Sequence, residues 1–187
     1  MVWCEENDCV KILTSSINKC KSHGIQAMGS SEFPLIEFCT IEDNKGCGIQ
    51  VCTGNSAQIR KNNIHNNEEG VEIISADPTL YKNTITKNNL NGILTRAVED
   101  LTCAPKISSN NISTNRSNGI ICLGYNNLTR IQENSQISFN RLAGIKIDQE
   151  AHTSILKNQI FKNIHQGILT KTIFHSRLGC DFFEIAI

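Results

Sequence analysis

Hydrophobic positions recur along the chain at a nearly constant interval, and each interval is marked by a glycine followed by Ile or Val. Successive marking glycines lie 24, 22, 22, 27, 25 and 23 residues apart, so seven repeats fill residues 11–170. A period of about 20 to 50 residues is typical of solenoids and other repeat architectures. The marking glycines are Gly24, Gly48, Gly70, Gly92, Gly119, Gly144 and Gly167.

Two further apolar positions precede each glycine at fixed distances. A central isoleucine lies seven residues before the glycine, or six before it in the third repeat. An outer apolar residue lies five before the central one, except for Ile131, which lies six before. The central residues are Ile17, Ile41, Ile64, Ile85, Ile112, Ile137 and Ile160, and the other outer residues are Ile12, Ile36, Ile59, Leu80, Ile107 and Ile155.

These spacings predict strands and not helices. Apolar residues two or five apart suit short strands separated by bends, and no stripe at i, i+3, i+4 and i+7 is sustained. The repeat is too short for the helix pairs of tetratricopeptide or ankyrin arrays and too poor in leucine for a leucine-rich repeat. The sequence therefore predicts an all-β parallel β-helix of about seven turns, with three short strands in each turn.

Asparagine recurs at two positions of the repeat, three residues after the central isoleucine and two before it. We expect both positions at tight bends, where Asn tolerates the left-handed backbone region and its amide can bond the same amide one turn away. Cys20, Ser15, Cys39 and Ser135 interrupt the two series. The predicted ladder residues are Asn44, Asn67, Asn88, Asn115, Asn140 and Asn163 in one series and Asn62, Asn83, Asn110 and Asn158 in the other.

The stretch KNNIHNNEEGVEI in the third repeat has two interpretations. In the first, Gly70 supplies a permissive bend before the next strand, and His65, Asn66, Glu68 and Glu69 face solvent. In the second, His65 binds a metal ion together with Glu68 or Glu69. We favour the solvated turn and expect no metal or other cofactor in this protein.

Composition and charge narrow the class of function. Eighteen basic residues balance eighteen acidic ones, and neither sign forms a block along the chain. Nucleic-acid binding and electrostatic membrane anchoring both need a concentrated basic surface, so we expect neither. No apolar run reaches the roughly 18 residues of a spanning helix, and the first residues do not resemble a secretory signal. Nine cysteines without a C-x-x-C pair are expected to be reduced thiols in a cytoplasmic protein.

The repeats IRKNNIHNNEEGVEI, ISSNNISTNRSNGIIC and ILKNQIFKNIHQGILT resemble the right-handed parallel β-helix repeat of the pectate-lyase-like superfamily, over about 160 of the 187 residues. The resemblance implies a right-handed, single-stranded β-helix. That superfamily includes polysaccharide lyases and hydrolases as well as intracellular eukaryotic proteins whose β-helix binds other proteins. GNSAQIRKNNIHNNEEGVEI is most similar to the second group, which includes certain F-box proteins that choose substrates for ubiquitin ligases.

The enzymes of that superfamily need carboxylates in register on adjacent turns. The six aspartates here are scattered over different registers, and no Asp-Asp pair occurs. The longest segment between repeats, from Gly92 to Ile107, is a candidate partner-binding loop that holds Arg96, Glu99 and Asp100. We therefore expect no catalytic residues.

The two ends of the chain depart from the repeat pattern. Residues 1–10, with Trp3, read as a partial turn, and the apolar residues 171–187 read either as a cap or as a tail that docks on another protein. The candidate partner-binding residues at the two ends are Trp3 in the first segment and Phe174, Phe182 and Phe183 in the tail.

The function expected from the sequence is that of a non-catalytic scaffold subunit in a larger protein assembly, with cytoskeletal and ciliary settings as possibilities. A carbohydrate-active or carbohydrate-binding β-helix is the first alternative. The substrate-recognition part of a ubiquitin-ligase adaptor is the second.

Overall fold

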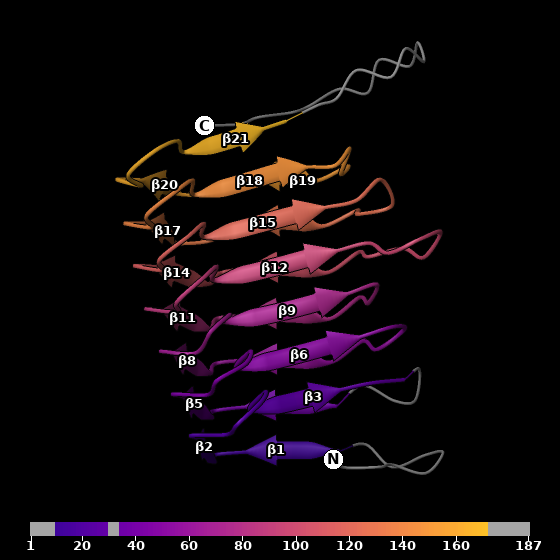
Figure 1. Ribbon diagram of the computed structural model, residues 1–187, viewed down its shortest axis with the longest axis vertical. Helices are drawn as coiled ribbons and strands as arrows, with labels where there is room; N and C mark the ends of the chain where they lie inside the picture. Colours follow the sequence, from indigo (N-terminus) through magenta and orange to yellow (C-terminus); the bar gives the residue numbers. More distant parts are fainter. Residues whose placement is uncertain (1–9, 30–33, 172–187) are drawn as a thin grey trace.

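The computed structural model describes residues 10–29 and 34–171, and its strands pair in parallel, each with its counterpart one repeat along the chain. They form three sheets of seven strands each, and within each sheet the strands are stacked along the long axis of the coil (Figure 1). The repeat sets the register, because Ile12 pairs with Ile36 in the first sheet and Ile17 with Ile41 in the second. The predicted all-β parallel β-helix is confirmed.

The strands are short and their bounds follow the repeat. The first sheet contains β1 (Lys11–Leu13), β4 (Leu35–Glu37), β7 (Gln58–Arg60), β10 (Thr79–Tyr81), β13 (Lys106–Ser108), β16 (Arg130–Gln132) and β19 (Ser154–Leu156). The second contains β2 (Ser16–Asn18), β5 (Thr40–Glu42), β8 (Asn63–His65), β11 (Thr84–Thr86), β14 (Asn111–Ser113), β17 (Gln136–Ser138) and β20 (Ile160–Phe161). The third contains β3 (Ile25–Ala27), β6 (Ile49–Cys52), β9 (Val71–Ile74), β12 (Ile93–Arg96), β15 (Ile120–Leu123), β18 (Ile145–Asp148) and β21 (Ile168–Thr170).

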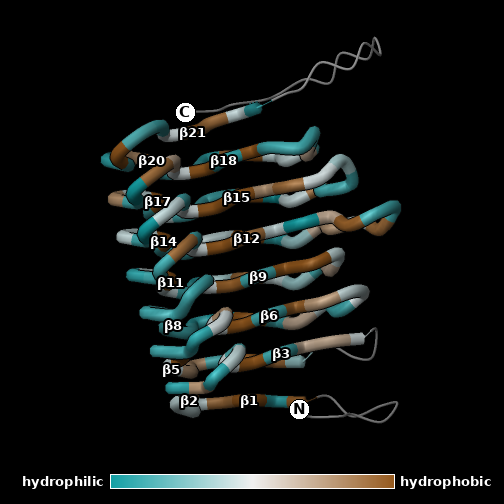
Figure 2. The backbone as a smooth tube through the Cα atoms, viewed as in Figure 1, coloured by the Kyte–Doolittle hydropathy of each residue, from teal (hydrophilic) through white to brown (hydrophobic). Residues whose placement is uncertain are grey.

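The core is a column of aliphatic side chains inside the coil. Each strand of the first and second sheets points one isoleucine or leucine inward, as Ile59 and Ile64 do, and both are fully buried. Each strand of the third sheet contributes two inward positions, such as Val71 and Ile73. Figure 2 shows the hydrophobic strands along the coil and the more hydrophilic bends beside them. Among the described residues there is no helix of the length and apolarity needed to cross a membrane.

Two asparagine ladders follow the bends on either side of the second sheet, as predicted. In one, the Asn88 side-chain amide donates to Asn115 Oδ1 at 2.9 Å, and the Asn115 amide donates to Asn140 Oδ1 at 3.0 Å. In the other, Asn110 donates to Asn134 Oδ1 at 3.1 Å. Asn134 therefore holds the position that we predicted for Ser135, since the extra residue of this repeat falls after the ladder position.

The left-handed backbone conformation at the bends lies one residue earlier than we predicted. The residue with positive φ is the one before each ladder position, as in Lys61, Asn66 and Phe139 with φ of 56°, 57° and 56°. The ladder asparagines themselves are not in the left-handed region. The prediction that they occupy this region was wrong.

The marking glycines serve close packing instead of a permissive bend. Gly70 does not have positive φ, so our interpretation of it was wrong. A Cβ built at Gly119 would lie 2.6 Å from the Gly144 carbonyl oxygen and 2.8 Å from Asn140 Nδ2. The glycine column therefore marks where one turn of backbone presses against the next, a contact that only a residue without Cβ permits.

Candidate functional site

The loops that follow the third sheet project from one edge of the coil. Residues 97–105, 124–129 and 149–153 connect β12, β15 and β18 to the next strands of the first sheet, and we call these three segments together the loop corner (Figure 1). They stack by backbone hydrogen bonds, from Leu128 N to Cys103 O at 2.7 Å and from His152 N to Asn127 O at 2.9 Å. The three loops thus form one continuous surface.

Buried side chains fix the loop corner from within. Cys103 and Asn127 are fully buried and form an isolated parallel bridge. The Asn127 amide donates to Thr95 Oγ1 at 2.8 Å and to the Leu123 carbonyl at 3.1 Å, while Asp77 Oδ1 accepts a bond from Ala104 N at 2.7 Å. These contacts hold the loops in one conformation, which lowers the entropy that a partner would have to remove on binding.

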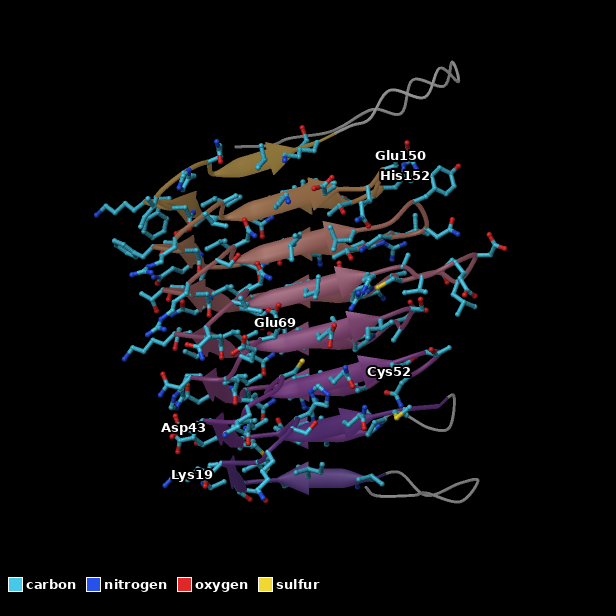
Figure 3. All side chains as sticks on the ribbon, in the orientation of Figure 1. Lys19, Asp43, Cys52, Glu69, Glu150 and His152 are labelled. Carbon is cyan, nitrogen blue, oxygen red and sulfur yellow. The ribbon has the colours of Figure 1, made fainter. Side chains whose placement is uncertain are left out.

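The outward side of the loop corner is apolar and acidic. Tyr125 is 65% exposed and its ring meets His152 edge to face with centroids 5.1 Å apart; His152 is labelled in Figure 3. Glu99, Asp100 and Glu150 are the charged residues of the three segments, which hold no Lys or Arg. The other exposed large apolar residues there are Val98, Leu101 and Leu128.

The sequence-predicted partner-binding residues are only partly brought together. Glu99 and Asp100 lie exposed at the tip of the first loop, but Arg96 lies in β12 and bonds Glu72 at 2.7 Å, so it belongs to the face of the third sheet. Trp3, Phe174, Phe182 and Phe183 lie outside the described residues. Their role stays a prediction.

Sequence reasoning missed Tyr125, Leu128 and His152. A signal was present, because the two longest intervals between marking glycines, 27 and 25 residues, are those that contain the first two loops. The extra residues of the 27-residue interval leave the coil at the loop corner, whereas the extra residue of the 25-residue interval is Ser135, between β16 and β17.

A polar network covers the start of the third sheet. Glu72 Oε2 accepts from Gln50 Nε2 at 2.8 Å and from Cys47 Sγ at 3.3 Å, in addition to the bond from Arg96. Gln26 donates in turn to Gln50 Oε1 at 2.6 Å. Cys47 and Gln50 belong to the turn before Glu72 and Arg96 to the turn after it, so the Glu72 carboxylate joins three neighbouring turns to one another.

Glu69 is buried, against our prediction that it faces solvent. It occupies the position just before the marking glycine, and its two oxygens accept from the Asn91 backbone N–H at 2.8 Å and side-chain amide at 3.1 Å. Asn118 donates to Asn91 Oδ1 at 2.9 Å, so these three residues form a third, shorter ladder that we did not predict. Burial raises the pKa of Glu69 to about 7, although the bonds from Asn91 oppose the shift. Glu69 is labelled in Figure 3.

The alternative metal interpretation gains no ligand set. His65 Nε2 lies 3.4 Å from Glu42 Oε2 on the neighbouring turn, and Glu68 is exposed. Within residues 10–29 and 34–171 no group of three or more His, Cys, Asp or Glu side chains is placed to hold a metal ion.

Comparison with known proteins adds one finding. A family model described as a right-handed β-helix region matches residues 2–102 and, overlapping this, residues 52–172. Searches of curated proteins and of solved structures gave no match.

Proposed function

Because the chain belongs to the family of right-handed β-helix regions, a family defined by its fold, we propose that it is a rigid, non-catalytic interaction module of a larger protein assembly. The loop corner is its docking surface. The observation that carries this proposal is the exposure of Leu101, Tyr125 and Leu128, at 46%, 65% and 44%, on two stacked loops that are fixed from within.

Such a surface suits protein binding. Tyrosine is enriched among residues that dominate binding energy at protein interfaces, and a large apolar patch on a rigid frame buries area at low entropic cost. The acidic rim formed by Glu99 and Asp100 favours a partner with basic residues around an apolar centre. A partner in the cytoplasm fits the expected location of the chain.

The arrangement of strand carboxylates supports a non-catalytic role. In the cross-strand pairs, Glu37 lies between Leu13 and Arg60, and Glu42 lies between Asn18 and His65. Glu72 likewise lies between Gln50 and Leu94. Glycoside hydrolysis needs two carboxyl groups that flank one bond, and these three carboxylates each face a residue of another kind.

One observation favours a carbohydrate-active enzyme as the second candidate. Glu69, with a pKa of about 7, has the raised pKa of a general acid, and Glu72, three residues further along the chain, bonds Arg96 at 2.7 Å. Glu69 is buried and both of its oxygens are bonded to Asn91, however, so its proton is not presented to a substrate. For this reason we place the scaffold first.

The test is purification of the tagged full chain from its native cell beside the double variant Leu101→Asp/Tyr125→Ser, followed by sizing and mass spectrometry. We expect the native chain to elute in a complex of fixed stoichiometry and the variant to lose the same partner. Met28→Ser, at another exposed apolar residue, is the control and should keep it. Recovery of the native chain as a monomer would overturn the proposal, and hydrolysis or cleavage of uronate polymers would establish the second candidate.

A further inference from the structure

Basic residues that are far apart in the sequence lie close together on the bends that precede the strands of the third sheet, at the strand ends opposite to the loop corner. Lys87, Arg116, Arg141 and Lys162 lie on the four successive bends that follow β11, β14, β17 and β20. Backbone bonds stack these bends, from Arg116 N to Asn88 O at 2.9 Å and from Arg141 N to Asn115 O at 3.0 Å. The sequence showed no basic block because the four bases are 21 to 29 residues apart. The fold makes them neighbours.

This charge is not neutralised locally. All four side chains are exposed, and the ion pairs of the described residues involve Arg60, Lys61, His65, Arg96 and Lys146 instead. The bend segments 87–91, 114–118, 139–143 and 162–167 contain no Asp or Glu. Of the three earlier bends of the same column, the first holds Lys19 and Lys21, but the second pairs Lys45 with Asp43 and the third holds Glu68 and Glu69. An unbroken run of bends without acidic residues is therefore found in the four later turns.

Large apolar side chains lie among these bases. Phe139 and Phe161 are 47% and 40% exposed and meet edge to face with centroids 6.2 Å apart. Lys162 Nζ lies 5.6 Å from the centre of the Phe139 ring. Leu90, Leu142 and Ile164 are exposed on the same bends, at 42%, 42% and 68%. We call the four bases and these five apolar residues the basic ridge; its bends lie to the left in Figure 1.

The spacing of the ridge selects among binding partners. Neighbouring turns of the coil are about 4.8 Å apart, and an α-helix lying along the coil presents one residue per turn every 5.4 Å or so. Over three steps the mismatch is roughly 2 Å, which the long Lys and Arg side chains absorb. An extended strand presents one face every ~6.7 Å, so its mismatch over three steps reaches about 6 Å.

We propose that the basic ridge is the docking site for an acidic amphipathic helix of a partner protein. Acidic side chains on successive helical turns face the four bases, and the adjoining apolar stripe of the helix covers Phe139, Phe161 and Ile164. This inference rests on the proposed function, since it makes the coil a protein-binding module with two surfaces of opposite charge on the two edges of the third sheet.

The test uses fluorescence anisotropy of the full chain with two labelled, helix-forming probe peptides. One carries Glu at i, i+4 and i+7 beside a Leu stripe, and its counterpart carries Lys in place of Glu. We expect saturable binding of the Glu peptide, weakened by added salt, and at least tenfold weaker binding of the Lys peptide. Arg116→Glu/Arg141→Glu should lower affinity for the Glu peptide at least tenfold, whereas Lys19→Glu/Lys45→Glu, on exposed bases of the earlier bends, should not.

Two outcomes would overturn the inference. The first is equal binding of both peptides, or of the Glu peptide by native chain and ridge variant, with circular dichroism showing both proteins folded. The second is binding to phosphatidylserine vesicles, lost in the ridge variant, without binding of the Glu peptide, because it would assign the ridge to a membrane surface. Either result leaves the loop-corner test untouched, since Leu101→Asp/Tyr125→Ser retains the ridge.

Discussion

Removing one amide from the middle of a ladder should destabilise the coil far more than removing an exposed asparagine next to it. Asn115 is fully buried, and its Oδ1 accepts from the Asn88 backbone N–H at 3.1 Å and the Asn88 side-chain amide at 2.9 Å. Asn115→Ala leaves both donors buried without that acceptor. At about 1–3 kcal/mol for each buried unsatisfied group, the expected loss is about 4 kcal/mol.

That loss is large beside the total stability of a domain, about 5–15 kcal/mol. With a denaturant slope near 2 kcal/mol per molar urea, the unfolding midpoint should fall by roughly 2 M. The assay is urea unfolding followed by circular dichroism. Asn89→Ala, at an exposed residue of the preceding bend, is the matched control and should change the unfolding free energy by less than about 0.5 kcal/mol.

A second variant separates the ladder from a mere cavity. In Asn88→Ala/Asn115→Ala the orphaned side-chain donor of Asn88 is gone, so the combined loss should be smaller than the sum of the two single losses. If Asn115→Ala costs no more than Asn89→Ala, or if the two ladder losses simply add, the bends are not held by the amide column and the reasoning is refuted.

Three further predictions use other features of the coil. Gly119→Ala should cost at least about 2 kcal/mol in urea unfolding because the new Cβ overlaps backbone, whereas Gly167→Ala, whose Cβ would meet only Ile160 Cγ2 at 3.7 Å, should be tolerated; similar losses would contradict the packing role. The pKa of Glu69 rises from 4.5 to about 7 on folding, so the folded state keeps the proton to higher pH than the unfolded state. The unfolding free energy should therefore fall as pH rises from about 4.5 to 7, by up to about 3 kcal/mol. In Glu69→Gln the unfolding free energy should depend less on pH over this range, and an unchanged dependence would contradict the prediction. Burial raises the pKa of Cys47, Cys103 and Cys122. These thiols should therefore resist a disulfide reagent at pH 8 until urea is added, whereas the half-exposed Cys20 should react. Labelling is read by peptide mass spectrometry, and rapid labelling of the three buried cysteines in the native chain would count against their burial.

The architecture was predictable from the sequence because the residues that face inward recur in every repeat. The outer and central isoleucines and the ladder asparagines depend on their neighbours one turn away, and the spacing among these positions within a repeat varies by at most one residue. Glu69 escaped prediction although Asn91 and Asn118 stand at the same place before their glycines, because this ladder spans only three turns and begins with a glutamate instead of an asparagine.

The surfaces were harder to predict, for a physical reason. Exposure of Tyr125 or Phe139 depends on what the adjoining turns leave uncovered, and the charge of the ridge depends on four bends that the sequence keeps far apart. The glycine column likewise shows its meaning only when the next turn is in place, because a Cβ at Gly119 is obstructed by Gly144.

The residues with positive φ point to a trade-off in how this fold is used. Each bend beside the second sheet spends a left-handed conformation, which glycine or asparagine would adopt more easily, on a residue such as Lys87, Thr114 or Phe139. Substituting glycine at these positions should therefore relieve backbone strain in the coil, but it would remove the outward side chains that distinguish one turn from the next. Substituting these outward residues one by one would give coils with the same backbone shape and different binding surfaces.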